Sequence, residues 1–201
     1  MIRSTLCYIE RDGCYLMLYR NKKKNDPNAG KWVGIGGKFE PGETADECLV
    51  REVREETGYT LTSYTFLGVV EFRNDAWEDE DMYLYLADRY RETEDRSVPD
   101  GGRESGNGGD PEAAAEGKSV KDSVSQNPDS PVCFETKSTS APDCNEGELR
   151  WIPKSDILSL NLWAGDRYFL EPMLRGETDL NMRLTYSGDT LISAEKTTGG
   201  N

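Results

Sequence analysis

The sequence predicts an α+β fold, in which helices pack on a mixed β-sheet. Several stretches rich in apolar, aromatic and β-branched residues have the length of β-strands, and turn residues separate them. Helical patterns follow residue 44 and return late in the chain, at 154–160 and 163–175. Because the chain has 201 residues, it is long enough for one domain with a core and too short for two large domains.

The first two strands are expected at residues 4–10 and 14–20, joined by Arg11-Asp12-Gly13, a sequence typical of hairpin turns. A polar loop, 21–31, comes next and carries four lysines: Lys22, Lys23, Lys24 and Lys31. These lysines can be explained as a solvated loop. Because the loop directly precedes a segment rich in carboxylates, contact with phosphate groups is the alternative.

A short buried strand at 32–35 leads to a helix with clear start and stop signals. Thr44 and Glu47, three residues apart, predict a capping box, and Gly58 stands where a C-terminal cap is expected. One flank of this helix is apolar and is expected to face the core: Leu49, Val50 and Val53. The helix should therefore have one side in the core and the other along a cleft.

The remaining elements continue the α+β pattern. Residues 61–73 and 82–87 are expected to form an antiparallel pair of strands. After a long polar segment, the expected elements are a strand at 147–153, a short helix at 154–160, an amphipathic helix at 163–175 and a hairpin within 178–196.

The polar segment covers about 93–142 and differs in composition from the rest of the chain. It contains 10 acidic and 5 basic residues, and Phe134 is its only aromatic residue. It cannot bury enough apolar surface to offset the entropy of ordering, which predicts a disordered, acidic, low-complexity insertion. A tolerated loop insertion explains it better than a regulatory element. We therefore expect a single domain over 1–201, interrupted by this insertion.

Charge and composition limit the classes of function. The net charge of −14 disfavours attraction to nucleic acid polymers and anionic membranes. The chain has no histidine, which excludes histidine triads and histidine-ligated zinc and leaves carboxylates, lysine, tyrosine and metal-bound water for chemistry. The N-terminus lacks a signal-peptide pattern, and no apolar run has membrane-spanning length. A cytoplasmic location is expected; the oligomeric state stays open, with a monomer slightly favoured.

Three glutamates on the first helix are the strongest chemical signal. Glu52, Glu55 and Glu56 are spaced three and four residues apart, so their carboxylates project from one side of the helix. Like charges at these spacings destabilise a helix by about 0.2–0.5 kcal/mol per pair. A hard divalent cation such as Mg²⁺ would offset that repulsion, because it prefers carboxylate oxygens. A solvated helix face is the alternative explanation.

The whole segment from Gly37 to Tyr59 resembles the signature of the Nudix hydrolase family. The matching positions are Gly37, Glu43, Arg51-Glu52-Val53, Glu55-Glu56, Gly58 and Tyr59. The resemblance implies an α/β/α sandwich with a mixed β-sheet, which binds Mg²⁺ or Mn²⁺ and hydrolyses a nucleoside diphosphate linked to another group. It implies a metal site formed by a backbone carbonyl at Gly37 with Glu52, Glu55, Glu56 and Glu146, and a supporting pair, Glu43 and Arg51.

Glu146 is similar to an acid that in relatives approaches the metals from a separate loop, as a ligand or a base. An exposed turn residue is the alternative interpretation of this position. Because the chain has no histidine, a glutamate must act as the base if any side chain does. Glu55, Glu56 and Glu146 all stay open for that role.

Three further segments resemble the MutT-type branch, which hydrolyses oxidised purine nucleoside triphosphates such as 8-oxo-dGTP: 30–38, 145–151 and 162–166. This likeness implies that Trp163 stacks on the base, that Asp166 recognises its edge, and that Lys23 or Lys38 contacts phosphates. Stacking on an aromatic side chain is worth about 1–3 kcal/mol, although a tryptophan can also serve only to pack a helix. In two places the sequence differs: Val33 stands where animal members have asparagine, and Gly165 precedes Asp166 where they have two acids.

The expected function is Mg²⁺-dependent hydrolysis of oxidised purine nucleoside triphosphates to the monophosphate and pyrophosphate, which would sanitise the nucleotide pool. Another nucleoside diphosphate derivative, such as ADP-ribose, a nucleotide sugar or a dinucleoside polyphosphate, is the first alternative. A non-catalytic nucleotide-sensing domain is the second alternative, although all the expected glutamates are present.

Overall fold

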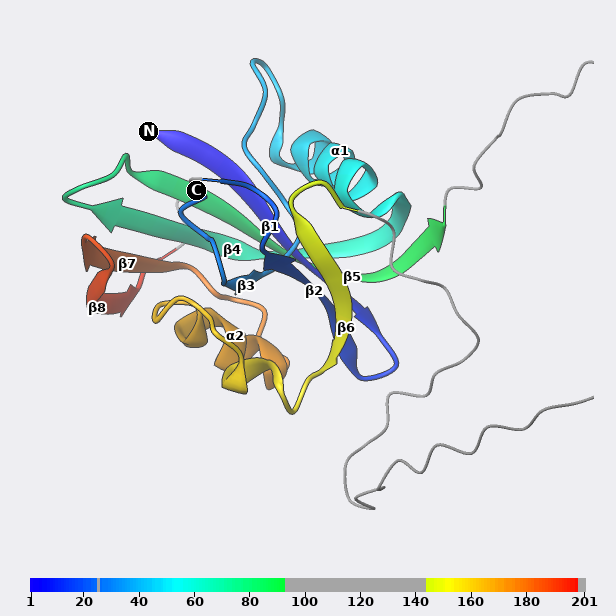
Figure 1. Cartoon of the computed structure of the whole chain (residues 1–201). Coiled ribbons are helices and arrows are strands. Elements are labelled where there is room, and N and C mark those ends of the chain that lie inside the picture. The colour runs from blue at the N-terminus through cyan, green and yellow to red at the C-terminus, as the bar shows by residue number, and fades with distance from the viewer. Residues whose placement is uncertain (25, 93–143, 199–201) are drawn as a thin grey trace, which may run out of the picture. The chain divides into compact units, whose positions relative to one another are not determined.

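A computed structural model describes residues 1–24, 26–92 and 144–198 (Figure 1). Within these residues, eight strands form one mixed sheet in the order β3-β2-β1-β5-β4-β7-β8, and β6 pairs with β2. The strands are β1 (Ile2–Arg11), β2 (Cys14–Arg20), β3 (Trp32–Val33), β4 (Tyr59–Asn74), β5 (Glu80–Glu92), β6 (Gly147–Pro153), β7 (Met182–Ser187) and β8 (Thr190–Lys196). The predicted insertion at 93–142 lies outside the described residues.

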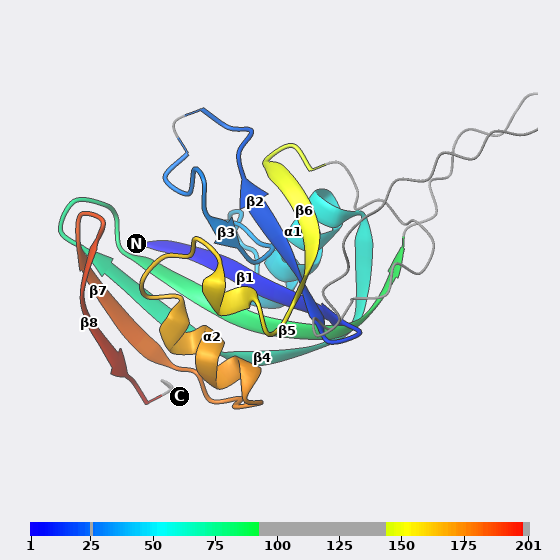
Figure 2. The same cartoon turned by 60° about the horizontal axis from the view of Figure 1, so that its bottom comes forward.

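Two α-helices, α1 (Ala45–Thr57) and α2 (Arg167–Leu174), lie on opposite faces of the sheet, as Figures 1 and 2 show. The alternation of side chains along β1 explains how the sheet serves both layers. Cys7 and Ile9 face the core under α1, whereas Tyr8 between them faces the core under α2. The predicted α+β sandwich is confirmed.

The sheet is mixed because β1 runs parallel to β5 and β4 runs parallel to β7, whereas the other pairs of strands are antiparallel. The antiparallel pair predicted for residues 61–73 and 82–87 is confirmed by β4 and β5. Their register runs from Tyr59 opposite Glu92 to Phe72 opposite Glu80. The two predicted hairpins are also present, as β1–β2 and β7–β8.

Helix α1 begins and ends where its caps predict. The Thr44 side chain accepts a hydrogen bond from the Glu47 amide at 3.3 Å, and the Glu47 carboxylate accepts one from the Thr44 amide at 2.9 Å. Gly58 ends the helix with a φ of 70°, a left-handed conformation that costs glycine little. Leu49 and Val53 are fully buried, which fixes the rotation of the helix against the sheet.

Three predicted elements are shorter than expected. The segment 154–160 contains only a single 3₁₀ turn, η1 (Ile157–Ser159), and the strand expected at 32–35 covers only Trp32–Val33. The late helix begins at Arg167 rather than at Trp163, because Trp163 and Asp166 are linked by a separate turn, with the Asp166 amide donating to the Trp163 carbonyl at 3.1 Å. Trp163 therefore lies before the helix and not on its surface. No helix among the described residues is long and apolar enough to cross a membrane.

Candidate active site

The loop that precedes α1 is held against β1 by backbone hydrogen bonds. Ile35 and Cys7 exchange two of them, at 2.7 and 2.8 Å, and the Thr5 amide donates to the Gly37 carbonyl at 2.9 Å. A Cβ atom on Gly36 would lie 2.1 Å from the Thr5 carbonyl oxygen, so this close approach requires glycine. The loop is thus a rigid support for whatever the glutamates of α1 bind.

Glu52 fills the space that Gly37 leaves empty. A Cβ atom on Gly37 would lie 2.4 Å from Oε1 of Glu52 and 2.6 Å from its Oε2. The carboxylate thus lies directly against the glycine of the loop. Burial raises the pKa of Glu52, and the negative charges of Glu55 and Glu146 raise it further, against the lowering effect of Arg51.

Glu56 is the most buried of the three glutamates on α1, with 7% of its surface exposed. Its carboxylate accepts a hydrogen bond from the Gly36 amide at 3.1 Å, which ties the helix to the loop. Burial, followed by the charges of Glu146 and Glu52, raises the pKa of Glu56 to about 8. The carboxylates of these residues are therefore close enough to repel one another in the absence of a cation.

Arg51 binds the carboxylates of Glu43 and Glu52. Its guanidinium donates to both oxygens of Glu43, at 2.8 and 2.9 Å, and to Oε1 of Glu52 at 2.7 Å. Hydrogen bonding to Arg51 lowers the pKa of Glu43 to about 2. Glu55 is more exposed, with 62% of its side chain accessible, and lies 3.6 Å from Arg51. This geometry is consistent with the predicted supporting role of Glu43 and Arg51.

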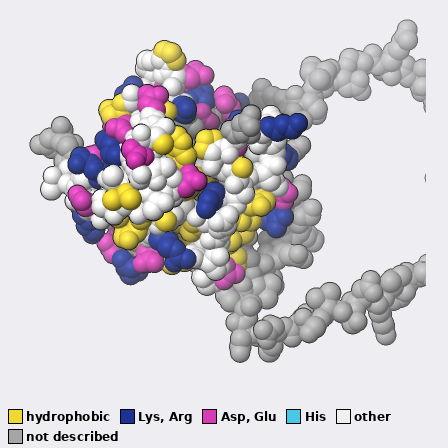
Figure 3. All heavy atoms as spheres, turned by 60° about the vertical axis from the view of Figure 1, so that its left-hand side comes forward, with side chains coloured by type: hydrophobic (Ala, Val, Ile, Leu, Met, Phe, Trp, Pro, Cys, Tyr) yellow, Lys and Arg dark blue, Asp and Glu magenta, His cyan; other side chains and the backbone are white. Residues whose placement is uncertain are grey.

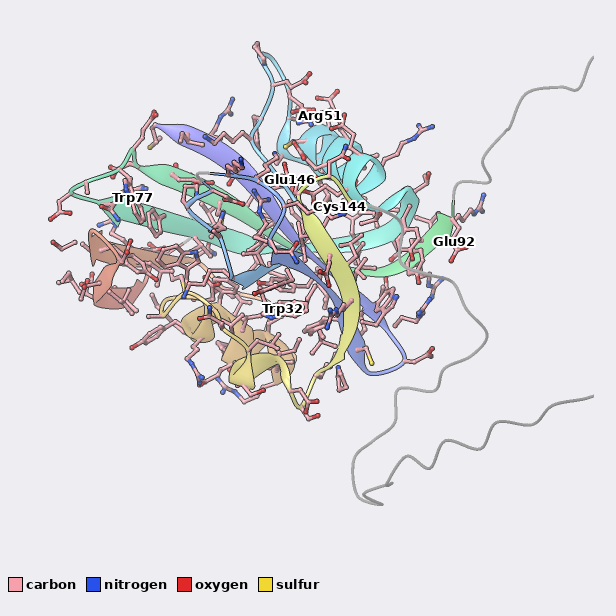
Figure 4. All side chains as sticks on the ribbon, viewed as in Figure 1. Trp32, Arg51, Trp77, Glu92, Cys144 and Glu146 are labelled. Atoms are coloured by element: carbon pink, nitrogen blue, oxygen red, sulfur yellow. The ribbon has the colours of Figure 1, made fainter. Side chains whose placement is uncertain are left out.

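Glu146 approaches from the turn before β6, which pairs with β2, and Figure 4 shows it on the same side of the molecule as Arg51. Its two carboxylate oxygens form ion pairs with Arg20 and with Lys23. Arg20 also donates to Asp26 at 2.7 Å, and only 13% of its side chain is exposed. The structure therefore brings Glu146 into direct contact with both Arg20 and Lys23.

Sequence reasoning missed Arg20. A signal was available, because Arg20 is the last residue of an apolar strand and directly precedes the lysine-rich loop. The phosphate ligands predicted from the sequence are lysines only, because Arg20 lies within the strand expected at 14–20. Lys38, the other predicted phosphate ligand, has an exposed side chain, and its backbone carbonyl accepts a hydrogen bond from Arg51 at 3.0 Å.

The residues present suit a hard divalent cation, although their side chains are not gathered around one. Among the described residues, no group of three His, Cys, Asp or Glu side chains is arranged to hold a metal ion. Glu52 is instead paired with Arg51, and Glu146 is paired with Arg20 and Lys23. The donor set nevertheless fits Mg²⁺: oxygen ligands only, mutually repelling carboxylates, and a glycine whose missing side chain makes room for one of them.

The backbone carbonyl that we predicted as a ligand is already engaged. The Gly37 carbonyl accepts hydrogen bonds from the Thr5 amide at 2.9 Å and from Cys48 Sγ at 3.5 Å. Gly37 stays a predicted ligand. Because its carbonyl already accepts two hydrogen bonds, the neighbouring Gly36 carbonyl in the same turn is the other candidate.

A second group of predicted residues surrounds Trp163. Its indole N–H donates to Asn28 Oδ1 at 2.8 Å, and the Lys31 ammonium lies 5.0 Å from the centre of its ring. Lys31 is held in turn by the Leu162 carbonyl at 3.0 Å. Asp166 is buried beside this group, and burial raises its pKa to about 7, against the lowering effects of the Trp163 backbone and Lys31. Asp166 can therefore exist as a neutral carboxylic acid near neutral pH.

Trp77 belongs to the same group, and sequence reasoning missed it. It lies on the turn between β4 and β5, and its ring centre is 6.0 Å from that of Trp163 at an angle of 77°. The only sequence signal was one large aromatic residue within an acidic loop, which by itself indicates no partner.

Comparisons with known proteins place the chain in a family. The model of the NUDIX domain family matches residues 2–116. The uncharacterized Nudix hydrolase YvcI of Bacillus subtilis is 26% identical over 192 residues, which cover 92% of this chain and 87% of that protein. The oxidized purine nucleoside triphosphate hydrolase of Danio rerio is 34% identical, and the nucleoside triphosphatase NudI of Salmonella typhimurium is 36% identical. These two matches cover 43% and 42% of this chain, and only 54% and 64% of the relatives.

Solved structures show the same fold. The crystal structure of the MutT protein from Bacillus halodurans superposes with a TM-score of 0.61 and 21% identity, over 97% of each chain. The solution structure of the E. coli ORF135 protein superposes with a TM-score of 0.55 and 20% identity, over 87% of this chain and 89% of that one. The sequence signature, the α/β/α sandwich and the match over more than half of the residues agree. The chain belongs to the NUDIX domain family.

Proposed function

We propose that this protein is a divalent-metal-dependent hydrolase of purine nucleoside triphosphates, with oxidised dGTP as the leading substrate. Water would be consumed, and the products would be the nucleoside monophosphate and pyrophosphate. The observation that carries this proposal is the group of carboxylates around Glu52 and Glu56, whose pKa values are raised and which lie against the glycine loop. Sanitation of the nucleotide pool would be the biological result.

The proposed metal is Mg²⁺, with Mn²⁺ as a substitute. Glu52, Glu55, Glu56 and Glu146 would hold it, together with a backbone carbonyl of the Gly36–Gly37 turn. When bound, such a metal neutralises phosphate charge and lowers the pKa of a coordinated water. Glu43 would keep Arg51 in place through its two-point hydrogen bond and so orient Glu52.

Arg20 and Lys23 would bind the phosphates. Both side chains are paired with Glu146, so a polyphosphate that takes these two cations would free the Glu146 carboxylate. The released carboxylate could then bind the metal or accept the proton of the attacking water. Glu55 and Glu56 stay alternatives for the second role. Lys38, whose side chain is exposed, stays a further candidate for phosphate binding.

Trp163 and Asp166 would recognise the base. The orientation of the indole is set by Asn28, and Asp166 is buried behind it with a pKa near 7. A neutral Asp166 can donate a hydrogen bond to an acceptor on a purine edge, which an ionised carboxylate cannot do. The names of the Danio and Salmonella relatives, a purine nucleoside triphosphate hydrolase and a nucleoside triphosphatase, support a triphosphate substrate.

The alternatives are other nucleoside diphosphate derivatives, a domain that binds nucleotides without cleaving them, and a polymer such as the 5′ end of RNA. All the expected glutamates are present, which disfavours the second. Against the third, acidic and basic side chains are interspersed on the face in Figure 3, and no broad basic patch is visible there. A small nucleotide as the partner, a cytoplasmic location, a monomer and a single domain interrupted at about 93–142 are our further predictions.

A substrate panel tests the proposal. The full chain, supplied with Mg²⁺, should hydrolyse 8-oxo-dGTP with a higher kcat/KM than dGTP, and both far faster than ADP-ribose or a dinucleoside polyphosphate. The released phosphate species, measured by ion chromatography, should be pyrophosphate. A faster reaction with ADP-ribose or the dinucleoside compound would overturn the substrate assignment, and no turnover of any compound would overturn the proposal that the protein is an enzyme.

A further inference from the structure

The turn between β4 and β5 carries a partly exposed tryptophan. Trp77 exposes 41% of its surface and stands among acidic neighbours in the sequence. It is nevertheless in contact with two other rings: it is nearly parallel to Phe72, at 6.5 Å, and meets Trp163 at 77° and 6.0 Å. Because aromatic pairs stabilise one another, these two contacts hold the indole in position while part of its surface stays accessible to a ligand.

These contacts close into a ring of four aromatic side chains. Trp77 contacts Phe72, whose ring centre lies 4.9 Å from that of Tyr186. Tyr186 meets Trp163 at 89°, with the ring centres 6.2 Å apart, and Trp163 contacts Trp77. The four residues come from the β4–β5 turn, from β4, from β7 and from the turn before α2. We call them the aromatic box. Phe72 and Trp77 are close in the sequence, whereas Trp163 and Tyr186 come from distant parts of the chain.

The turn that carries Trp77 is anchored on both sides. Asp75 accepts hydrogen bonds from the Ser187 hydroxyl at 2.6 Å and from the Gly188 amide at 2.9 Å, both in the β7–β8 hairpin. On the other side, the Ile2 amide donates to the Asp79 carbonyl at 2.8 Å. Trp77 is therefore held in position, and a ligand would not have to order this turn when it binds.

Trp163 has one face covered and one edge fixed. The Lys31 ammonium lies 5.0 Å from its ring centre and is held by Asn161 Oδ1 at 3.1 Å, and the indole N–H is bound to Asn28. A base that stacks on Trp163 would use the face opposite Lys31. Since Trp77 stands at 77° to that ring and 6.0 Å from its centre, its plane is steeply inclined to a base stacked there, as a side wall requires.

We propose that Trp77 is a specificity-determining residue of the nucleobase site, where it forms a side wall that favours a purine over a smaller pyrimidine. The inference rests on the proposed purine substrate and adds a residue to the same site. A purine stacked on Trp163 extends further than a pyrimidine and so gains more contact with the wall.

Binding of nucleoside monophosphates tests this inference without any need for turnover. Calorimetry would give Kd values of dGMP and dCMP for the unaltered full chain and for Trp77→Ala, Trp77→Phe and Tyr168→Ala. Tyr168 is the matched control, because it is an aromatic residue with 52% exposure on α2, outside the aromatic box. Circular dichroism would confirm that each variant is folded.

We expect Trp77→Ala to raise the Kd of dGMP about 3- to 10-fold, in line with the value of aromatic contacts, and to raise that of dCMP less. Trp77→Phe should lie between the two, and Tyr168→Ala should leave both values unchanged. If Trp77→Ala is misfolded, Trp77→Leu replaces it, and the same weakening relative to Trp77→Phe is expected.

Four results would overturn the inference: a Kd of dGMP for Trp77→Ala within 1.5-fold of the unaltered chain, an equal fold-change for dGMP and dCMP in Trp77→Ala, an equal change in Tyr168→Ala, or no measurable binding of dGMP by the unaltered chain. The proposed function fails separately. A chain that binds dGMP through Trp77 but cleaves no triphosphate contradicts the proposed activity alone, whereas an active chain that is unaffected by Trp77→Ala contradicts only this inference.

Discussion

Gly37 and Glu52 are in direct contact: a Cβ atom on Gly37 would lie 2.4 Å from Oε1 of the Glu52 carboxylate. The atoms that would be displaced are the far end of a flexible side chain and not backbone, so the fold can adapt while the carboxylate cannot stay in place. A substitution at Gly37 should therefore disturb the position of the Glu52 carboxylate without disturbing the fold.

The first prediction follows from this contact. Gly37→Ala should fold normally but lower kcat by about 100-fold, the loss that a displacement of about 1 Å can cause in an active site. Gly42→Ala is the matched control in the same loop, because no atom lies within 4 Å of its Cβ position. Because Gly42 has a φ of 86°, the Gly42→Ala substitution should cost about 1–2 kcal/mol of folding stability, and activity should be retained. Equal activity of the two variants would contradict the role given to Glu52.

The second prediction concerns Glu56 and metal binding. Burial and the charges of Glu146 and Glu52 raise its pKa from 4.5 to about 8. A raised carboxyl pKa means that the folded state keeps its proton longer than the unfolded state, so the metal-free protein should lose stability as pH rises from about 4.5 to about 8. Glu56→Gln should be more stable than the unaltered chain at pH 8 in EDTA.

Addition of Mg²⁺ should reverse that order. It should raise the melting temperature of the unaltered chain through binding to the folded state, and raise that of Glu56→Gln much less. Glu171→Gln, on the exposed surface of α2, serves as the control and should behave like the unaltered chain. Thermal unfolding with and without Mg²⁺ measures the difference. An equal Mg²⁺-induced shift in Glu56→Gln would argue against Glu56 as a ligand.

The third prediction concerns Asp166, whose pKa is raised by burial to about 7. The sign is the same as for Glu56: the stability that this group contributes falls as pH rises from about 4 to about 7 and then stays level. Each pH unit corresponds to about 1.4 kcal/mol, which gives about 4 kcal/mol as an upper limit. Asp166→Asn should remove this part of the pH dependence. Chemical unfolding at pH 5 and pH 8 measures it; unchanged curves would show that Asp166 is not buried as an acid.

The fourth prediction concerns the base-stacking role of Trp163. Trp163→Ala should lower kcat/KM for 8-oxo-dGTP at least about 5-fold, because stacking on an aromatic ring is worth about 1–3 kcal/mol per base. It should also change the ratio between 8-oxo-dGTP and dGTP. Steady-state kinetics with both substrates tests this. A small and equal effect on the two would leave Trp163 with only a packing role against Tyr186.

Much of this fold could be predicted because its signals are local. The caps of α1 at Thr44 and Gly58 come from hydrogen bonds within a few residues, and the structure places the helix between them. Alternating apolar residues likewise predicted β1 and β2. The start of α2 could not be predicted in the same way. The segment from Trp163 is apolar enough for a helix, but its first residues are held by distant partners such as Asn28 and Tyr186.

The candidate site shows the same division. The glutamates of α1 stand in one signature, so the sequence names them as candidates, and resemblance adds Glu146; these roles stay predictions. Arg20 and Trp77 were missed because their roles depend on contacts across the fold: Arg20 with Glu146, 126 residues away, and Trp77 with Trp163. Such contacts arise from sheet topology, which composition and spacing do not encode.

Glu52→Gln is the most direct test of the central claim that this chain cleaves nucleotides through metal ions held on α1. The change keeps the size of the side chain and its hydrogen bonding to Arg51 through oxygen, but removes the negative charge. With 8-oxo-dGTP and Mg²⁺, kcat should fall at least about 100-fold, because a proposed ligand of the metal that stabilises charge in the transition state is lost. Turnover of every nucleotide at the rate of the unaltered chain would contradict the claim.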